Sequence, residues 1–382
     1  MLGRLLEGLP KDSYTVMANT YEIFKNAPQT GTWLPCDYYF VDKKTPISGL
    51  GLSKFRSTSV KRKDAPNAMF LTLTSIKSIF SIPNLARTIH QKQPLYAILT
   101  TSDNGPFLIG GFLTARRLKL PLYIYLFDLY AGNAFPFHIQ WLAYFVEPIM
   151  FKQATKIFVT NRHTKQYLQN KYRFIEDKFV VCPNPAQQRK PAPIKPSPKK
   201  TIVYTGNIYW AQQSNLRDLV QAVHSLPDVE LHLYAPLTPD QFVSMGLHGP
   251  NVVTGSLSAE QAWQAQCEAT ILFLPMTFTK QSRDIVMTAS PGKLSDYLAV
   301  GRPILVYAPP YSQIARYARE EGFAYVVDKQ DPRALAHAIT EMLEKPVLTK
   351  SLITHSKRLL AKEYDLGTIR QRFLETIGQA GV

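Results

Sequence analysis

The sequence predicts an α/β protein made of two doubly wound domains, and three observations carry this prediction. Runs of apolar and β-branched residues recur along the chain and alternate with segments of helical periodicity. These runs are nearly continuous rather than alternating, as is typical of parallel strands covered by helices on both faces. A segment rich in proline and lysine, 186–200, divides the chain near its middle. We therefore expect two Rossmann-like domains facing a cleft, with function in the loops that follow strands.

The first domain is expected to span residues 1–185. Its predicted strands lie in the runs SYTVMA, CDYYFV, LYAILTTS, LYIYLFD, KIFVT and KFVVCP. The chain opens in a segment that resembles a helix, MLGRLLEGL, where a domain of this kind normally opens with a strand. We therefore expect that a short first strand is missing.

The second domain is expected to span residues 201–350. Its predicted strands lie in TIVYTG, VELHLYA, NVVTG, TILFLP, PILVYA and AYVVD. Residues 351–382 carry helical spacing in Leu, Ile and Phe but have no further strand to cover. We expect this helical tail to pack back on the first domain.

The composition favours an anionic partner. Among the 382 residues, 44 Lys and Arg outnumber 28 Asp and Glu, which gives a formal net charge of +16. No RNP, KH, zinc-finger or basic-zipper pattern accompanies this charge, so nucleic acid is not an expected partner. Three widely spaced cysteines, Cys36, Cys182 and Cys267, argue against a disulfide framework and for reduced thiols. No apolar run approaches the roughly 20 residues of a membrane-spanning helix.

The segment SPGKLSDYLAVGRPILV, residues 290–306, carries the strongest chemical signal. Ser290 is a favourable N-cap and Pro291 a favourable first residue, so we expect a helix to begin here. Gly292 and Lys293 would lie in its first turn, where free backbone N–H groups and a full positive charge favour a phosphate. Gly301 is expected to end the helix.

Asp296 follows Lys293 by three residues and falls on nearly the same helix face. A carboxylate one turn beyond a phosphate site can accept hydrogen bonds from ribose hydroxyls. Spacing alone also fits an ordinary capped helix with a surface pair of charges, and this alternative stays open.

The same segment resembles the donor-binding segment of GT-B glycosyltransferases of the retaining family 4 type. The matching positions are Pro291, Lys293, Tyr297, Ala299, Gly301 and Pro303, and the resemblance extends to IVYTGNIY, DLYAGNAF and VVCPNP. It implies that the second domain holds a nucleotide-diphosphate sugar and the first holds an acceptor, with retention at the anomeric carbon. The family's pair of glutamates would fall on Thr288 and Asp296, so the first carboxylate is absent.

Other candidates lie in loops after strands of the second domain. Gly206 and Asn207 follow its first strand, where a turn can approach phosphate, although a plain strand-turn-helix fits as well. Lys280 or Arg283, in TFTKQSRDIV, is expected to supply charge to the diphosphate, and a solvent-facing position is the alternative.

Candidates on the acceptor side lie in the first domain. Asp128 follows the strand LYIYLF and could orient or deprotonate the acceptor hydroxyl. Asp103 and Asn104 occupy the matching loop one strand earlier. A helix cap or loop hydrogen bond is the competing interpretation for these side chains. The aromatic stretch 135–151 could contact a membrane beside a lipid-linked acceptor, but burial against the sheet is favoured.

The sequence contains no Asp-x-Asp, HExxH, Walker A or GxGxxG pattern. We therefore expect no metal and no cofactor, with a nucleotide sugar as donor substrate and a sugar, lipid-linked or other acceptor. Two alternatives stay open. One is a degenerate GT-B module that binds nucleotide sugar or a protein partner without catalysis, and the other is a sugar-nucleotide epimerase of the same fold.

Overall fold

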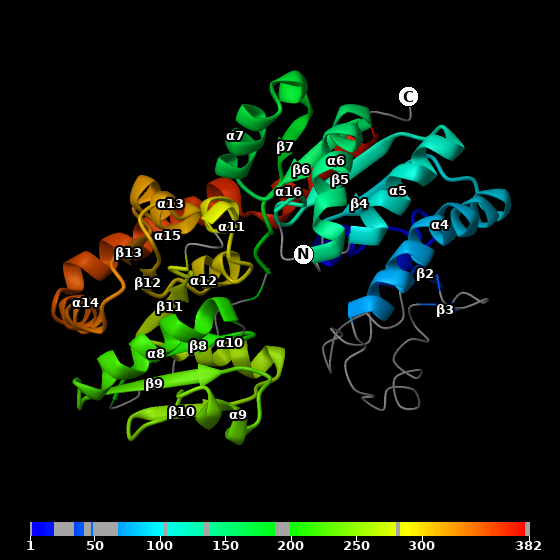
Figure 1. Cartoon of the computed structure of the whole chain (residues 1–382). Coiled ribbons are helices and arrows are strands. Elements are labelled where there is room, and N and C mark those ends of the chain that lie inside the picture. The colour runs from blue at the N-terminus through cyan, green and yellow to red at the C-terminus, as the bar shows by residue number, and fades with distance from the viewer. Residues whose placement is uncertain are drawn as a thin grey trace. The chain divides into compact units, whose positions relative to one another are not determined.

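The computed structural model describes the chain in several segments. The described residues are 2–18, 34–41, 47–48, 68–102, 105–132, 137–187, 189, 199–208, 210–279 and 283–378. The chain divides into two compact units, residues 1–182 with 370–382, and residues 183–369. Each unit is an α/β structure containing a parallel sheet (Figure 1).

The first unit contains a small sheet and a larger one. The small sheet consists of β1 (Val16–Ala18), β2 (Asp37–Phe40) and β3 (Ile47–Ser48), with β1 parallel and β3 antiparallel to β2. The larger sheet has four parallel strands in chain order, β4 (Ile98–Thr101), β5 (Leu122–Leu126), β6 (Lys156–Val159) and β7 (Phe179–Val181). Every residue of β5 is buried, as its continuous apolar run predicts. The strands predicted in this half are confirmed.

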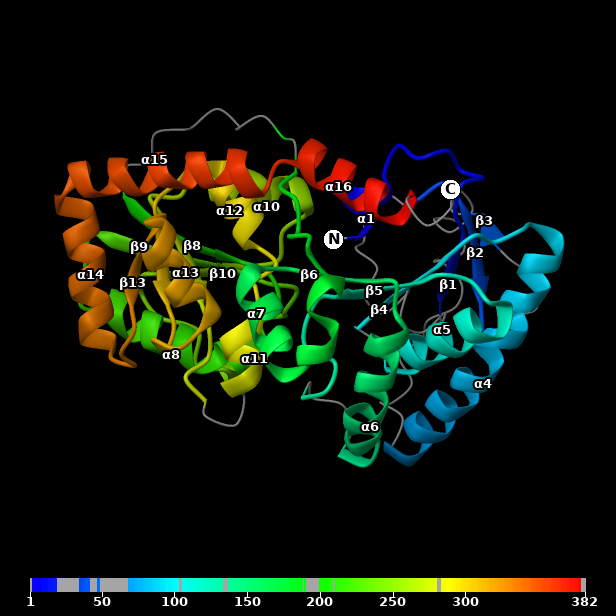
Figure 2. The same ribbon diagram turned by 90° about the horizontal axis from the view of Figure 1, so that it is seen from above.

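Helices cover both faces of the larger sheet. Figure 2 shows three of them on one side and α16 on the other. The three are α4 (Ala68–Lys92), α5 (Gly105–Leu118) and α6 (Phe137–Gln153), whereas α16 spans Leu366–Gly378. The ring of Phe373, in α16, lies 5.0 Å from that of Phe158, and the Tyr123 hydroxyl donates to the carbonyl of Ile377 at 3.1 Å. The remaining helices of this unit are α1 (Leu2–Leu6), α7 (Arg162–Lys171) and the 3-10 helix η1 (Arg173–Lys178).

Helix α6 departs from the sequence prediction. The aromatic stretch 135–151 is expected to be buried against the sheet, and Met150 and Phe151 are buried there. Trp141 and Phe145, however, are exposed. The prediction is therefore correct for one side of the helix and wrong for the other.

The second unit is a six-stranded parallel sheet in the order β10-β9-β8-β11-β12-β13. Its strands are β8 (Lys200–Thr205), β9 (Val229–Tyr234), β10 (Val252–Gly255), β11 (Ile271–Pro275), β12 (Ile304–Tyr307) and β13 (Ala324–Val327). All six predicted strands are confirmed. The strand order reverses at β8 and β11, so the loop that leaves β8 lies at the switch point where doubly wound sheets bind ligands.

Two layers of helices enclose this sheet. One face packs against α8 (Trp210–His224) and α14 (Pro332–Glu344), and the other packs against α10 (Ala259–Glu268), α12 (Leu294–Val300), α13 (Gln313–Glu321) and α15 (Pro346–Glu363). Short helices α9 (Pro239–Ser244) and α11 (Arg283–Thr288) complete the unit. The boundary between units falls after Ile369, so α15 belongs to the second unit although the sequence places a boundary at 351.

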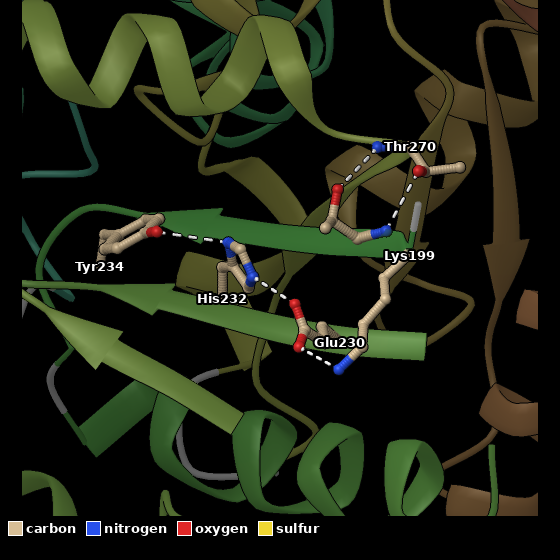
Figure 3. Close-up of polar contacts among 6 residues, drawn as sticks. Lys199, Glu230, His232, Tyr234 and Thr270 are labelled. Carbon is tan, nitrogen blue, oxygen red and sulfur yellow. Dashed lines mark hydrogen bonds and ion pairs between the residues drawn. The ribbon is translucent and has the colours of Figure 1, made fainter. Parts of the chain in front are cut away.

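A row of polar side chains crosses β9 on its half-buried face (Figure 3). Lys199 donates to Glu230 at 2.7 Å, Glu230 contacts His232 at 3.3 Å, and His232 contacts the Tyr234 hydroxyl at 3.2 Å. The hydrogen bond from Lys199 lowers the pKa of Glu230. Alternate strand residues share a face, so these contacts form one ladder along the strand. The ladder ends at Tyr234, beside the loop after β8.

All three cysteines are buried and free, as their spacing predicts. Within the described ranges, no helix is both long enough and apolar enough to cross a bilayer.

Candidate functional site

The loop that follows β8 lies against the side chain of Lys293. Gly206 has a φ of 119°, a backbone region that side chains with a Cβ rarely adopt, and its N–H donates to the carbonyl of Tyr234 at 2.9 Å. A Cβ atom at this position would lie 3.3 Å from the Nζ of Lys293. The backbone conformation therefore favours glycine here, and a Cβ would also crowd the end of the lysine side chain. Two residues that the sequence singles out separately are thus brought together.

Lys293 places its charge at the carboxyl edge of the sheet. Its Nζ lies 3.6 Å from the centroid of the buried Tyr204 ring, whose hydroxyl donates to the carbonyl of Asn207 at 2.7 Å. No carboxylate among the described residues forms an ion pair with this lysine. Burial lowers the pKa of Lys293 to about 7, because loss of water disfavours the charged form. An anion placed here would favour the charged form again.

The helix after this lysine begins later than the sequence predicts. Ser290 is not its cap and Pro291 is not its first residue, because α12 begins at Leu294 with Lys293 at the N-cap position. The carbonyl of Pro291 instead accepts from the Leu294 N–H at 2.9 Å, so the exposed Gly292 lies in a turn before the helix. Gly292 therefore lies in this turn and not in the first turn of the helix, and its role in phosphate binding stays a prediction.

A long-range contact holds the turn before the helix. The side-chain amide of Asn184 donates to the carbonyl of Gly292 at 3.0 Å and to the Ser295 hydroxyl at 3.4 Å. It lies far away in the sequence, in the VVCPNP segment, and fixes the turn from outside. The predicted end of the helix is confirmed, because Gly301 is left-handed with a φ of 70°.

Helix α12 is anchored to the end of β8. The buried Tyr297 hydroxyl accepts from the backbone N–H of Thr205 at 3.3 Å, and burial raises its pKa to about 12. Leu294 and Leu298 are buried, as their spacing predicts. Asp296, in the first turn of this helix, is half-buried. That Asp296 accepts hydrogen bonds from ribose hydroxyls stays a prediction.

The remaining donor-side candidates lie elsewhere in the second unit. Arg283 is exposed at the start of α11, and its guanidinium lies 4.8 Å from the ring centroid of Tyr311. Lys280 lies outside the described residues. Thr288, which takes the place of the family's first glutamate, is buried and donates to the carbonyl of Asp284 at 2.8 Å. Gly206, Asn207 and Lys293 therefore form the group that the structure brings together.

On the acceptor side, Asp128 is exposed in the loop after β5. The backbone N–H groups of Phe127 and Asp128 donate to the Ser102 hydroxyl at 3.1 and 3.4 Å. Ser102 is buried at the end of the neighbouring strand β4, so one hydroxyl fixes the start of this loop. Asp103 and Asn104 lie outside the described residues.

A buried carboxylate holds Ala131, further along the same loop. Glu147, in α6, is 1 % exposed and accepts from the Ala131 N–H at 2.7 Å, from the Tyr172 hydroxyl and from Lys171 Nζ at 3.0 Å. Burial, together with this carboxylate, raises the pKa of Tyr172. Three donors satisfy the buried charge, as such a group requires. Neither Glu147 nor Ser102 is predicted from the sequence, although a lone acid inside the apolar run YFVEPIMF is a signal for a buried polar contact.

The two Rossmann-like units define the GT-B fold, and comparison with known proteins supports this class. Residues 199–345, which include the Gly206 and Lys293 group, match the family model described as Glycosyl transferases group 1. A search of curated proteins found no match.

Solved structures resemble this chain over most of its length. Sucrose-phosphate synthase from Thermosynechococcus elongatus matches with a TM-score of 0.60 and 15% identity, over 80% of this chain and 79% of that one. Anabaena HepE in complex with UDP matches with a TM-score of 0.57 and 15% identity, over 78% and 82%. A putative UDP-N-acetylglucosamine 2-epimerase from Listeria monocytogenes matches with a TM-score of 0.57 and 14% identity, over 96% of both chains. At these identities the likeness establishes the fold.

Proposed function

We propose that this protein transfers a sugar from a nucleotide-diphosphate sugar to an acceptor, as a GT-B enzyme of the retaining family 4 type. The second unit binds the donor and the first unit binds the acceptor. The family match over residues 199–345 supports the reaction class. Structural neighbours that hold UDP and UDP-glucose support the choice of donor.

One observation carries the proposal. Lys293 is a half-buried cation beside a glycine turn at the switch point of a parallel sheet, and it has no carboxylate partner among the described residues. A buried charge is costly unless a counter-charge satisfies it. A diphosphate supplies that charge, and the missing Cβ of Gly206 leaves room for its oxygens to approach.

In this proposal, Lys293 also speeds cleavage of the bond between the sugar and the diphosphate. Breaking the bond between the sugar and the diphosphate places negative charge on the leaving oxygen, and Lys293 stabilises it there. Because the cation is provided by the chain, the reaction in this proposal needs no divalent metal. Asp296 accepts hydrogen bonds from the ribose, and Asp128 orients the acceptor hydroxyl, whose proton passes to the leaving diphosphate as the acceptor oxygen bonds to the sugar on the same face.

A binding and turnover experiment tests the proposal. UDP and other nucleoside diphosphates are titrated against the full chain by calorimetry, and nucleotide release from UDP-sugars is followed with and without sugar acceptors. We expect tight binding of one nucleotide and its release on transfer. Lys293→Ala and Asp296→Ala should each weaken binding, whereas Lys350→Ala, which removes an exposed lysine of α15, serves as the matched control.

The other outcomes separate the alternatives. Nucleotide binding without release from any sugar nucleotide indicates a binding module. Conversion of the donor sugar to its epimer without release indicates an epimerase, the activity named for the Listeria neighbour. Unchanged UDP binding in both variants contradicts the site itself.

A further inference from the structure

Helix α6 has an outward face that is apolar rather than polar. Its inner side contributes Ala143, Met150 and Phe151 to the core of the first unit. On the opposite side, four large side chains are half exposed or more: Trp141 60%, Tyr144 51%, Phe145 69% and Ile149 50%. Spacings of three and four residues place them on one face of the helix. These four residues are called the aromatic face below.

This concentration is specific to α6. Large apolar side chains are exposed elsewhere in the described part of the chain, but no other helix there carries more than two of them. Singly exposed apolar residues are normal on a protein surface, whereas contiguous ones mark a contact surface. Trp141 and Phe145 also pack edge to face, with ring centroids 6.2 Å apart, so they form a continuous apolar patch.

Positive charge accompanies the apolar surface. Helices α4, α5 and α6 together contain six Lys and Arg residues, Lys77, Arg87, Lys92, Arg116, Arg117 and Lys152, and all six are exposed. Their sequences contain one acidic residue, Glu147, which is buried in its contacts with Ala131, Lys171 and Tyr172. Lys152 follows Ile149 by three residues, and the Nζ of Lys171 lies 5.7 Å from the Tyr144 ring centroid. Lys152 thus places an exposed cation at the edge of the aromatic face, whereas the charge of Lys171 is paired with Glu147.

These charges favour an anionic lipid surface over a second copy of the chain as the partner of the aromatic face. In a symmetric dimer through α6, two copies of the same basic surface, each with an exposed Lys152, would face one another, and like charges repel. An anionic lipid surface offers the opposite charge together with an apolar interior. Tryptophan and tyrosine are the residues enriched where water meets the bilayer.

We propose that the aromatic face of α6 lies in the interface of a membrane that contains anionic lipids. The helix lies in the membrane plane, with the aromatic face among the upper acyl chains and the lysines at the headgroups. The loop that carries Asp128 lies close by, because a Cβ at Gly132 would be 3.8 Å from the Tyr144 hydroxyl. Binding to vesicles requires no donor or acceptor, so this proposal stands or falls independently of the transferase activity.

Vesicle co-sedimentation of the full chain tests the proposal. Vesicles of phosphatidylcholine alone are compared with vesicles that also contain phosphatidylglycerol. The wild-type protein should bind the mixed vesicles more tightly, and added salt should weaken that binding. The double variant Trp141→Ser with Phe145→Ser should lose roughly tenfold or more in affinity, because two exposed rings no longer insert.

Matched variants separate insertion of the aromatic face from nonspecific hydrophobic binding to vesicles. Val243→Ser with Val347→Ser removes two exposed apolar side chains of the second unit and should leave vesicle binding unchanged. Lys152→Gln should weaken binding to the mixed vesicles by roughly fivefold, the contribution of one lysine near an anionic surface. Because all these side chains are exposed, circular dichroism should show each variant folded like the wild type.

Three results would overturn the proposal. One is wild-type protein that stays in the supernatant with both kinds of vesicle. Another is a Trp141→Ser with Phe145→Ser variant that binds as the wild type does. The third is a wild-type dimer, seen by analytical ultracentrifugation, that this variant dissociates while vesicle binding is absent, which would assign the face to a second copy of the chain.

Discussion

Two loops that leave parallel strands, one in each unit, differ in charge. The loop after β8 brings a half-buried lysine against Gly206, with no carboxylate among the described residues to pair it. The loop after β5 instead exposes Asp128, while Ser102 and Glu147 hold its backbone. One loop thus presents a cation and the other a carboxylate, which is the difference that the proposed donor and acceptor roles require.

The largest effect is expected from removing the cation. Lys293→Ala should weaken UDP binding by roughly a hundredfold, since a charge-assisted contact contributes about 2–3 kcal/mol. Calorimetric titration measures this, with Lys350→Ala as the control. Equal affinities in the wild type and Lys293→Ala would show that the charge difference between the two loops has no bearing on donor binding.

The next effect concerns pH. Burial sets the pKa of Lys293 at about 7, and a bound diphosphate raises it, so binding above pH 7 must take up a proton. UDP affinity should therefore fall as pH rises, by up to about tenfold per unit between pH 7 and 9. Calorimetry over this range avoids the titration of the phosphate itself, whose second pKa is about 6.

An arginine variant sharpens the pH experiment. Lys293→Arg keeps its charge throughout this range, so the affinity of that variant should not change with pH. An equally steep dependence in Lys293→Arg would mean that another group takes up the proton.

A smaller effect is expected at the glycine of the same loop. Gly206→Ala introduces a Cβ at a φ of 119° and 3.3 Å from Lys293 Nζ, so the backbone or the lysine must shift. The free energy of unfolding should fall by about 1–3 kcal/mol. Urea denaturation measures the loss, and Gly378→Ala, where a Cβ meets nothing within 4 Å, provides the control. A fully stable Gly206→Ala protein would contradict the described turn.

The smallest effect is expected on the acceptor side. Glu147→Gln keeps an acceptor for the Ala131 N–H but loses the ion pair with Lys171. Transfer to the acceptor should slow by a few-fold, while UDP affinity stays at the wild-type value, because the change lies in the other unit. Parallel measurements of turnover and of UDP binding separate the two effects. An equal loss of UDP affinity in Glu147→Gln would contradict the proposal that the loop after β5 serves only the acceptor.

The sequence predicts the sheets better than the turns between them. Continuous apolar runs such as TILFLP admit few structures other than buried parallel strands, and all six runs of the second unit form strands. Ser290 and Pro291 form a local capping signal, yet α12 begins at Leu294, after a turn that the distant Asn184 contacts. Contacts between segments that are distant in the sequence are not visible in a local pattern, and tertiary context routinely overrides local preference.

The contacts within the candidate site also could not be predicted from local sequence patterns. Gly206 and Lys293 were each identified from their own segment, yet their contact depends on how β8 and α12 pack. Helix α6 was assigned to the core because its run is apolar all round, and such a run does not reveal which side faces water. Glu147 and Ser102 act through backbone groups of a loop, and spacing gives no sign of such pairs.

The crossing of α16 from one unit to the other has a consequence for biosynthesis. Residues 183–369 form one uninterrupted stretch, whereas the first unit needs Phe373 to cover Phe158 and Ile377 to receive the Tyr123 hydroxyl. Domains usually fold in the order in which the ribosome makes them. In this protein the first unit cannot be completed until α16 has been synthesised. The second unit, residues 183–369, can therefore finish folding before the first.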